Sequence, residues 1–262
     1  MSSVKILSGW SNPGGSTVHH IALTNLLNSK GVACTFYGPH EYHLDKCKGE
    51  KIDKILITPE DILISHFLNV PNTPGGWRQH ILSCHETNLF PLAHLTSDQI
   101  TTYDTIQYVS NRQKEWHSVD HPSVVIPPIV AQIDWATPEN KCAGVIGSID
   151  SHKQPHLSIQ AALDDGFNQV LLFGEITESP YFNEKVSPYV ERGQAALRGH
   201  ESDRKAMYEQ IEAVYHSSLR ETYGLVEAEC RLAGIPFVGT SNEQPILTKD
   251  EIWERWEECL NL

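Results

Sequence analysis

The chain has 262 residues and a formal net charge of −13 at pH 7, and 40% of its residues are hydrophobic. This length corresponds to one large or two smaller domains at roughly 100–200 residues each, and the hydrophobic fraction excludes a disordered chain. No run approaches the roughly 18 apolar residues of a membrane-spanning helix, and the first apolar run is too short for a secretory signal.

The charge and the cysteines narrow the class of protein further. Residues 1–138 carry nine basic against 12 acidic side chains, whereas residues 139–262 carry 11 against 21. Non-specific nucleic-acid binding needs clustered cations and is disfavoured, although the less acidic first half could hold a local anionic ligand. The six cysteines form no C-x-x-C pair. We therefore expect reduced thiols, no zinc or redox motif, and a cytoplasmic protein.

The first 38 residues predict a β–loop–α–β unit. A buried strand is expected at 4–10, and the Pro-Gly-Gly within the loop 11–16 excludes a continuous helix. Apolar residues then recur at helical spacing over 17–31, where Gly31 closes the helix, and a second strand follows at 32–38. Such a unit is typical of a doubly wound parallel sheet.

The rest of the chain continues this pattern after one interruption. Further strands are expected at 54–58, 61–67, 80–84, 105–109 and 123–126. Two prolines then stop regular structure, and 127–141 is a candidate linker. Beyond it the sequence predicts strands at 142–147, 169–174 and 235–240, and helices at 156–166, 202–216, 223–234 and 248–262, the last amphipathic. We expect two α/β domains, 1–138 and 139–262, with ligands bound at the carboxyl ends of their strands.

Two loops between a strand and a helix could bind phosphate. The loop 11–16 contains Gly14 and Gly15, which allow close backbone approach beside a helix N-terminus, although an ordinary tight turn explains it equally well. It is not a G-x-G-x-x-G loop and lacks the lysine of a P-loop. The loop 147–155 places Lys153 just before a helix, where its charge could act on a diphosphate; the alternative is a solvated surface lysine.

A third segment, ETYGLVEAECRLAGIPFV at 221–238, carries two carboxylates eight residues apart. Glu221 is expected in a loop and Glu229 on the following helix, around a Tyr-Gly turn. Carboxylates in this position can accept hydrogen bonds from sugar hydroxyls while loop N–H groups face a phosphate. The alternative is an ordinary acidic helix N-terminus.

This third segment resembles the E-x7-E signature of glycosyltransferase family 4 and its GT-B relatives. Other segments resemble further family motifs in the same order: SNPGG, SCHETN, YDTIQYVSNRQKEW, VIPPIVAQIDW and GSIDSHKQPHLSIQAA. The resemblance implies a GT-B fold, α/β with two Rossmann-like doubly wound parallel-sheet domains facing across a cleft. Residues 1–138 would form the acceptor domain and residues 139–262 the nucleotide-sugar donor domain.

The resemblance also implies a role for each matching residue. Lys153 would contact the donor diphosphate, Glu229 the ribose and Glu221 the donor sugar, and His85 would lie close to the reacting sugar. The backbone of a loop would face the donor: Tyr223, Gly224, Leu225 and Val226. The remaining donor-binding positions are Gly14 and Gly15 beside the diphosphate, Arg198, Gly199 and His200 at the base pocket, and Ser148, which stands where the family has an arginine.

The implied activity is retaining transfer of a hexosyl or pentosyl group from a nucleotide-diphosphate sugar, preferably a UDP-sugar, to an acceptor hydroxyl. No D-x-D occurs in the sequence, so we expect no metal at the diphosphate and no cofactor beyond the nucleotide sugar. A non-catalytic sugar-nucleotide binding module or partner subunit is the alternative, because Ser148 removes a cation. The acceptor stays open between a glycan, a small molecule and a modified nucleobase.

Overall fold

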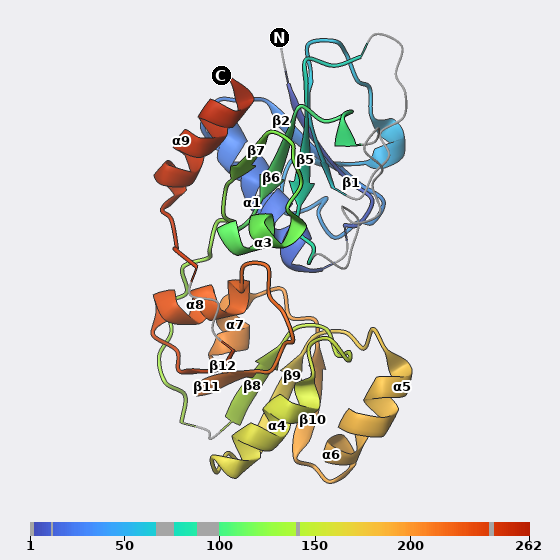
Figure 1. The fold of residues 1–262 in the computed structure, drawn as a ribbon. Helices are drawn as coiled ribbons and strands as arrows, with labels where there is room; N and C mark the ends of the chain where they lie inside the picture. Colours follow the sequence, from blue (N-terminus) through green and yellow to red (C-terminus); the bar gives the residue numbers. More distant parts are fainter. Residues whose placement is uncertain (1–2, 12, 67–75, 88–99, 140–141, 241–243) are drawn as a thin grey trace. The chain divides into compact units, whose positions relative to one another are not determined.

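Figure 1 shows the computed structural model of the chain, which describes residues 3–11, 13–66, 76–87, 100–139, 142–240 and 244–262. The predictions made for Asn12, Phe67, Asn88 and Lys141 lie outside the described residues. The contacts within the chain divide it into two units. Unit 1 is Met1–Ile129 with Pro245–Leu262, and unit 2 is Val130–Gln244.

Unit 1 contains a seven-stranded sheet in the order β3-β2-β1-β4-β5-β6-β7, with every strand pair parallel. Its described elements are β1 (Val4–Ser8), α1 (Gly15–Ser29), β2 (Cys34–Gly38), β3 (Gly49–Lys51), the 3₁₀ turn η1 (Ile52–Lys54), β4 (Ile62–His66), β5 (Gln79–Cys84), β6 (Thr105–Tyr108), α3 (Asn111–His117), β7 (Ser123–Val125) and α9 (Lys249–Leu260).

The sheet of unit 1 is buried on both faces, as parallel sheets usually are. Alternate residues of β1, Val4 and Ile6, point into the larger core, which also holds Phe36 of β2 and Leu23 of α1. Leu7, the next residue of β1, lies in a second cluster on the opposite face. Every residue of β2 and β4 is therefore buried, on both faces of the sheet rather than on one.

The helix α9 belongs to unit 1, which corrects the predicted boundary that placed 248–262 in the second domain. Ile252, Trp256 and Leu260 are fully buried in the core formed by β1, β2, β4, β5 and α1. Arg255 Nη1 donates to the carbonyl of Val125 at 2.9 Å. The helical spacing reveals an apolar stripe, but any sheet with an uncovered apolar face can accept such a stripe.

Unit 2 contains a five-stranded parallel sheet in the order β10-β9-β8-β11-β12, with apolar clusters on its two faces. Its described elements are β8 (Cys142–Ile146), α4 (Pro155–Asp164), β9 (Gln169–Phe173), α5 (Ser179–Tyr181), the π-helical turn η3 (Phe182–Val186), α6 (Ser187–Glu191), β10 (Ala195–Gly199), α7 (Arg204–Tyr208), β11 (Ala213–His216), α8 (Leu225–Ala233) and β12 (Phe237–Gly239).

The predicted class, α/β with two doubly wound parallel sheets, is confirmed, but two predicted elements are wrong. The expected strand at 54–58 is a 3₁₀ turn followed by a loop, and the edge strand β3 precedes it. The expected helix at 202–216 is a short helix, α7, followed by the central strand β11. Residues 213–216 pair with β8 and β12, so sheet pairing overrides the continuous helical pattern.

In the part of the chain that the structure describes, no helix is both long and apolar enough to cross a membrane.

Candidate functional site

Each sheet has a point at which the strand order reverses. In unit 1 it lies between β1 and β4, and in unit 2 between β8 and β11. In open α/β sheets, ligands bind outside the carboxyl ends of the strands at such a switch point, because the adjoining loops diverge there. The residues that follow these strands are therefore the candidates, and they form a separate group in each unit.

In unit 2 the switch point brings Lys153 and Glu221 together. Lys153 lies in the loop between β8 and α4, and Glu221 follows β11; their side chains form an ion pair between Lys153 Nζ and Glu221 Oε1. His216, the last residue of β11, places Nε2 at 2.9 Å from the same oxygen. The side chains of Lys153 and Glu221 keep 25% and 19% exposure, so a ligand can reach both.

The loop that carries Lys153 is organised by Asp150. Asp150 accepts the backbone N–H of Lys153 at 2.8 Å and the hydroxyl of Ser148 at 2.6 Å. The same loop is joined to the loop after β11, because the N–H of Leu219 donates to the carbonyl of His152 at 3.0 Å. These bonds hold the lysine against Glu221. Neither Asp150 nor His216 is among the site residues expected from the sequence: the segment 147–162 contains Asp150 but points only to Ser148 and Lys153, and His216 lies outside every recognised motif.

The Glu221 carboxyl is ionised at neutral pH. Burial raises its pKa, but the charge of Lys153 and the hydrogen bond and charge of His216 lower it more, so the net pKa lies well below the usual range. An ionised carboxylate accepts hydrogen bonds and cannot donate one. Glu221 therefore suits a sugar hydroxyl better than a role as general acid.

Glu229 does not join Glu221 but has its own partners. It lies on α8, is 2% exposed, accepts a hydrogen bond from the Tyr208 hydroxyl at 2.7 Å, and has Arg204 Nε at 3.5 Å. Burial raises its pKa, and Arg204 and Tyr208 oppose that change. Arg204 belongs to α7 and lies beside Glu229.

Glycines shape the backbone around this site. Gly224 precedes α8 with φ of 84°, a left-handed conformation that favours glycine, so the predicted Tyr-Gly turn is the start of the helix. Tyr223 is buried and Leu225 and Val226 are the first two residues of the helix. A Cβ atom added to Gly174, after β9, would lie 1.9 Å from the Gly147 carbonyl oxygen, so the loops after β8 and β9 pack backbone against backbone.

The remaining predicted residues divide between the units. Arg198 and Gly199 end β10 in unit 2, and His200 follows them. Gly14 and Gly15 lie in unit 1, where Gly14 precedes α1 and no side chain among the described residues caps the helix N-terminus. The first backbone N–H groups of a helix can bind an anion when no side chain of the protein takes them.

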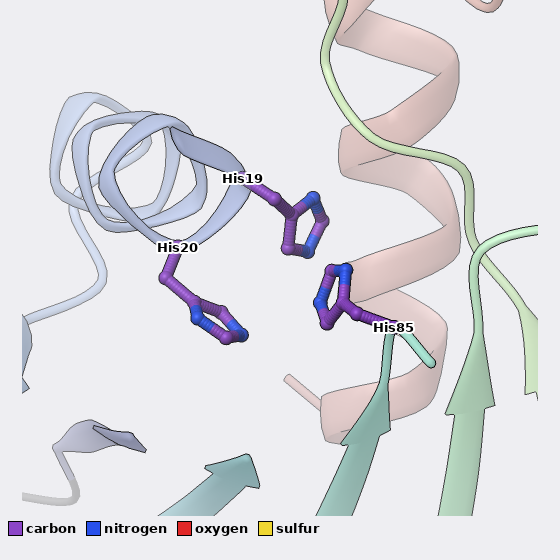
Figure 2. Close-up of side chains that lie close together, drawn as sticks. All are labelled: His19, His20 and His85. Carbon is purple, nitrogen blue, oxygen red and sulfur yellow. The ribbon is translucent and has the colours of Figure 1, made fainter. Parts of the chain in front are cut away.

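His85 lies in unit 1 within a group of histidines that no sequence motif connects. His19 and His20 come from α1, and the ring centroid of His85, just after β5, is 4.8 Å from that of His19 and 5.0 Å from that of His20 (Figure 2). His66, at the end of β4, is 5.2 Å from His85. One ring nitrogen from each of His19, His20 and His85 lies within 4.8 Å of the others, so these three could hold a metal ion.

His19, His20 and His85 are neutral at pH 7. Burial and the neighbouring imidazoles lower the pKa of His19 to about 3, and the same causes lower the pKa values of His20 and His85 well below the usual range. The neighbouring His66 contacts two polar groups: Ser8 Oγ lies 3.0 Å from its Nδ1 and Glu86 Oε1 lies 2.7 Å from its Nε2.

No protein-family model and no curated protein matches this chain. Solved structures do match it. The structure of HepE from Anabaena in complex with UDP-glucose aligns with a TM-score of 0.66 and 12% identity, over 98% of this chain and 90% of HepE. WaaG, a glycosyltransferase involved in lipopolysaccharide biosynthesis, aligns with a TM-score of 0.63 and 12% identity, over 100% and 91% of the two chains.

AviGT4, a glycosyltransferase involved in avilamycin A biosynthesis, aligns with a TM-score of 0.60 and 17% identity, over 91% of this chain and 78% of AviGT4. At 12–17% sequence identity these comparisons show a similar fold and nothing more. The two parallel-sheet α/β units therefore have the fold of the GT-B glycosyltransferases.

Proposed function

We propose that this chain is a glycosyltransferase that moves a sugar from a nucleotide-diphosphate sugar, preferably a UDP-sugar, to an acceptor hydroxyl. The observation that carries this proposal is the contact between Lys153 and Glu221 at the switch point of the second sheet. It puts a cation suited to a diphosphate beside a carboxylate suited to sugar hydroxyls. The likeness in fold to HepE, solved with UDP-glucose, supports the same class of donor.

A site for sugar transfer must stabilise the charges that develop during the reaction. The diphosphate gains negative charge as it leaves, while the sugar becomes oxocarbenium-like. Lys153 lies two residues before α4. The positive end of the α4 helix dipole would therefore act on the diphosphate together with the Lys153 ammonium group. Groups held in place before the reaction stabilise such charge as it develops, because they need no reorganisation.

Glu221 would position the donor sugar through its hydroxyls. Its low pKa supports this role and disfavours hydrolysis by a glycosidase mechanism, in which one carboxyl group must be protonated to donate to the leaving oxygen. Glu229 would accept hydrogen bonds from the ribose. Tyr208 and Arg204 hold that carboxylate in one orientation.

The finer features of the reaction are proposed from the family resemblance. They are retention of the anomeric configuration, transfer of a hexosyl or pentosyl group, a donor-facing loop at 223–226, a base pocket at 198–200, and no metal ion at the diphosphate. The acceptor would be a glycan, a small molecule or a modified nucleobase.

Calorimetric titration with UDP, GDP and ADP tests the donor site directly. We expect micromolar binding of UDP to the wild-type protein and much weaker binding to Lys153→Ala. Lys185→Ala is the matched control, because Lys185 also belongs to unit 2 and pairs with an exposed carboxylate, Glu184. Equal binding of UDP to wild type and Lys153→Ala, or no binding of any nucleotide to folded protein, would contradict the proposed donor site.

A second candidate function rests on Ser148. Its hydroxyl donates to Asp150, so this position supplies no cation to a leaving diphosphate. A protein that binds a sugar nucleotide without transferring the sugar would keep the nucleotide affinity and lack turnover. Incubation with UDP-glucose and a panel of acceptors separates the two functions, since only the transferase releases UDP in an acceptor-dependent way.

A further inference from the structure

We propose that His19, His20 and His85 bind a divalent transition-metal ion, with Zn²⁺ as the ion that fits best. This inference goes beyond the proposed sugar transfer and does not depend on it, because all three ligands belong to unit 1. Figure 2 shows His19 and His20 leaving α1 toward His85 at the end of β5. The three ligands thus come from two elements that the fold holds in place.

Ser83 determines where the protons of two of these histidines lie. Gln107 donates through Nε2 to the carbonyls of Ile126 at 2.7 Å and Tyr108 at 3.0 Å, so its Oε1 must accept the Ser83 hydroxyl at 2.7 Å. The hydroxyl has a single hydrogen and has now used it. Ser83 Oγ can then only accept hydrogen bonds, from Nε2–H of His85 at 3.0 Å and of His20 at 3.3 Å.

Several ring nitrogens of His19 and His20 are left without a hydrogen-bond partner within the described part of the chain. Nδ1 of His20 and both ring nitrogens of His19 are buried and have no hydrogen-bond partner among the residues that the structure describes. Burying an unsatisfied polar group costs roughly 1–3 kcal/mol in proteins, so such groups call for an explanation. An ion that accepts electron pairs from the imidazoles would remove this deficit.

Contacts around the three histidines favour the same conclusion. His66 and Glu86 lie alongside as a hydrogen-bonded pair, and the Glu86 carboxylate also accepts the backbone N–H of His85 at 3.1 Å. Outer contacts of this kind orient metal ligands.

The three nitrogen ligands indicate which class of metal ion the site would bind. Three nitrogens suit Zn²⁺, Co²⁺, Ni²⁺ or Cu²⁺, whereas Mg²⁺ and Ca²⁺ prefer oxygen ligands. Zinc binds imidazole nitrogen at about 2.0–2.1 Å, so the three nitrogens must close in slightly around the ion. The search for a D-x-D pattern could not have detected this site. An ion held there makes His85 a ligand, a different role from the sugar contact implied by the family resemblance.

The test uses the 262-residue chain without a tag, treated with a chelator and then titrated with Zn²⁺ and with Co²⁺ in the absence of nucleotide. We expect a single ion per chain and the visible absorption bands of four- or five-coordinate Co²⁺. Loss of an outer-shell contact alone costs roughly 10–100-fold in affinity. His19→Ala and His20→Ala should therefore each weaken binding by more than about 100-fold, whereas the exposed His40→Ala should bind as the wild type does.

Folding is checked separately, since His20 packs against Phe36 in the core. His19→Gln and His20→Gln retain most of the side-chain volume, so they should stay folded by circular dichroism and still lose the ion. The inference is overturned if the wild-type protein binds neither ion, or if His19→Gln binds as tightly as His40→Ala. A thiolate-to-cobalt charge-transfer band would also overturn it, because it would place the ion on cysteine.

Discussion

Glu221 shows at the residue scale how the fold can stabilise one charge state. Its folded pKa lies below the unfolded value of about 4.3. The unfolded chain therefore binds a proton at this site more readily than the folded chain does. The stabilisation from Glu221 is fully present above the unfolded pKa and is lost as the pH falls toward the folded pKa.

Glu221→Gln should therefore reduce the dependence of stability on pH in the acid range. We expect the variant to be less stable than wild type at pH 7 by about 1.5–3 kcal/mol, the usual contribution of hydrogen bonds to a charged group. That difference should shrink between about pH 5 and pH 3. Urea unfolding at a series of pH values measures it. The exposed Glu184→Gln serves as control, and a wild-type-to-variant difference that stays constant with pH would contradict the prediction.

Tyr208 provides a second test at this scale. Its hydroxyl donates to the buried Glu229 carboxylate, so Tyr208→Phe leaves that carboxylate with one partner fewer. We expect a loss of about 1–3 kcal/mol in the free energy of unfolding, because a buried charged acceptor loses its donor. Tyr189→Phe is the matched control, since the Tyr189 hydroxyl donates to the exposed Gln160. Equal unfolding free energies for the two variants would rule out this role for Tyr208.

At the scale of elements, α9 shows how far the sequence can lead. Its start was predictable: Thr248 and Glu251 form a capping box, in which each side chain bonds to the other's backbone N–H. Its apolar stripe was also visible as Ile252, Trp253, Trp256 and Leu260, of which all but Trp253 are fully buried. Which sheet the stripe covers depends on the surface that the other elements leave open, and that surface exists only in the folded chain.

Trp256→Ala tests the placement of α9 energetically. Trp256 is fully buried in the core of unit 1, and removing such a side chain costs about 3–5 kcal/mol through lost burial and the cavity that remains. The exposed Glu254→Ala on the same helix should change stability by less than about 0.5 kcal/mol. Denaturant unfolding followed by tryptophan fluorescence measures both. A small effect of Trp256→Ala would show that α9 does not close the core of unit 1.

At the scale of the whole molecule, a bound donor should stabilise the folded protein. UDP at 100 times its dissociation constant raises the free energy of unfolding by about 2.7 kcal/mol when it binds only the folded state. Scanning calorimetry should show this as a raised melting temperature for wild type and Lys185→Ala. At the same UDP concentration, Lys153→Ala should show little change. An equal rise with ADP would argue against uridine as the preferred base.

Local sequence patterns were enough to predict the class of fold, the order of most strands and helices, and the loops that carry Lys153, Glu221 and Gly224. These features depend on local spacing: apolar runs, prolines and glycines, and a motif contained within 18 residues. Which side chains contact one another depends on how the elements pack in the folded chain. Lys153 and Glu221 are 68 positions apart and pair because β8 and β11 are neighbours in a parallel sheet. His19 and His20 reach His85 because α1 packs beside the end of β5. Contacts of this kind arise from strand order and helix docking, which local sequence patterns do not encode.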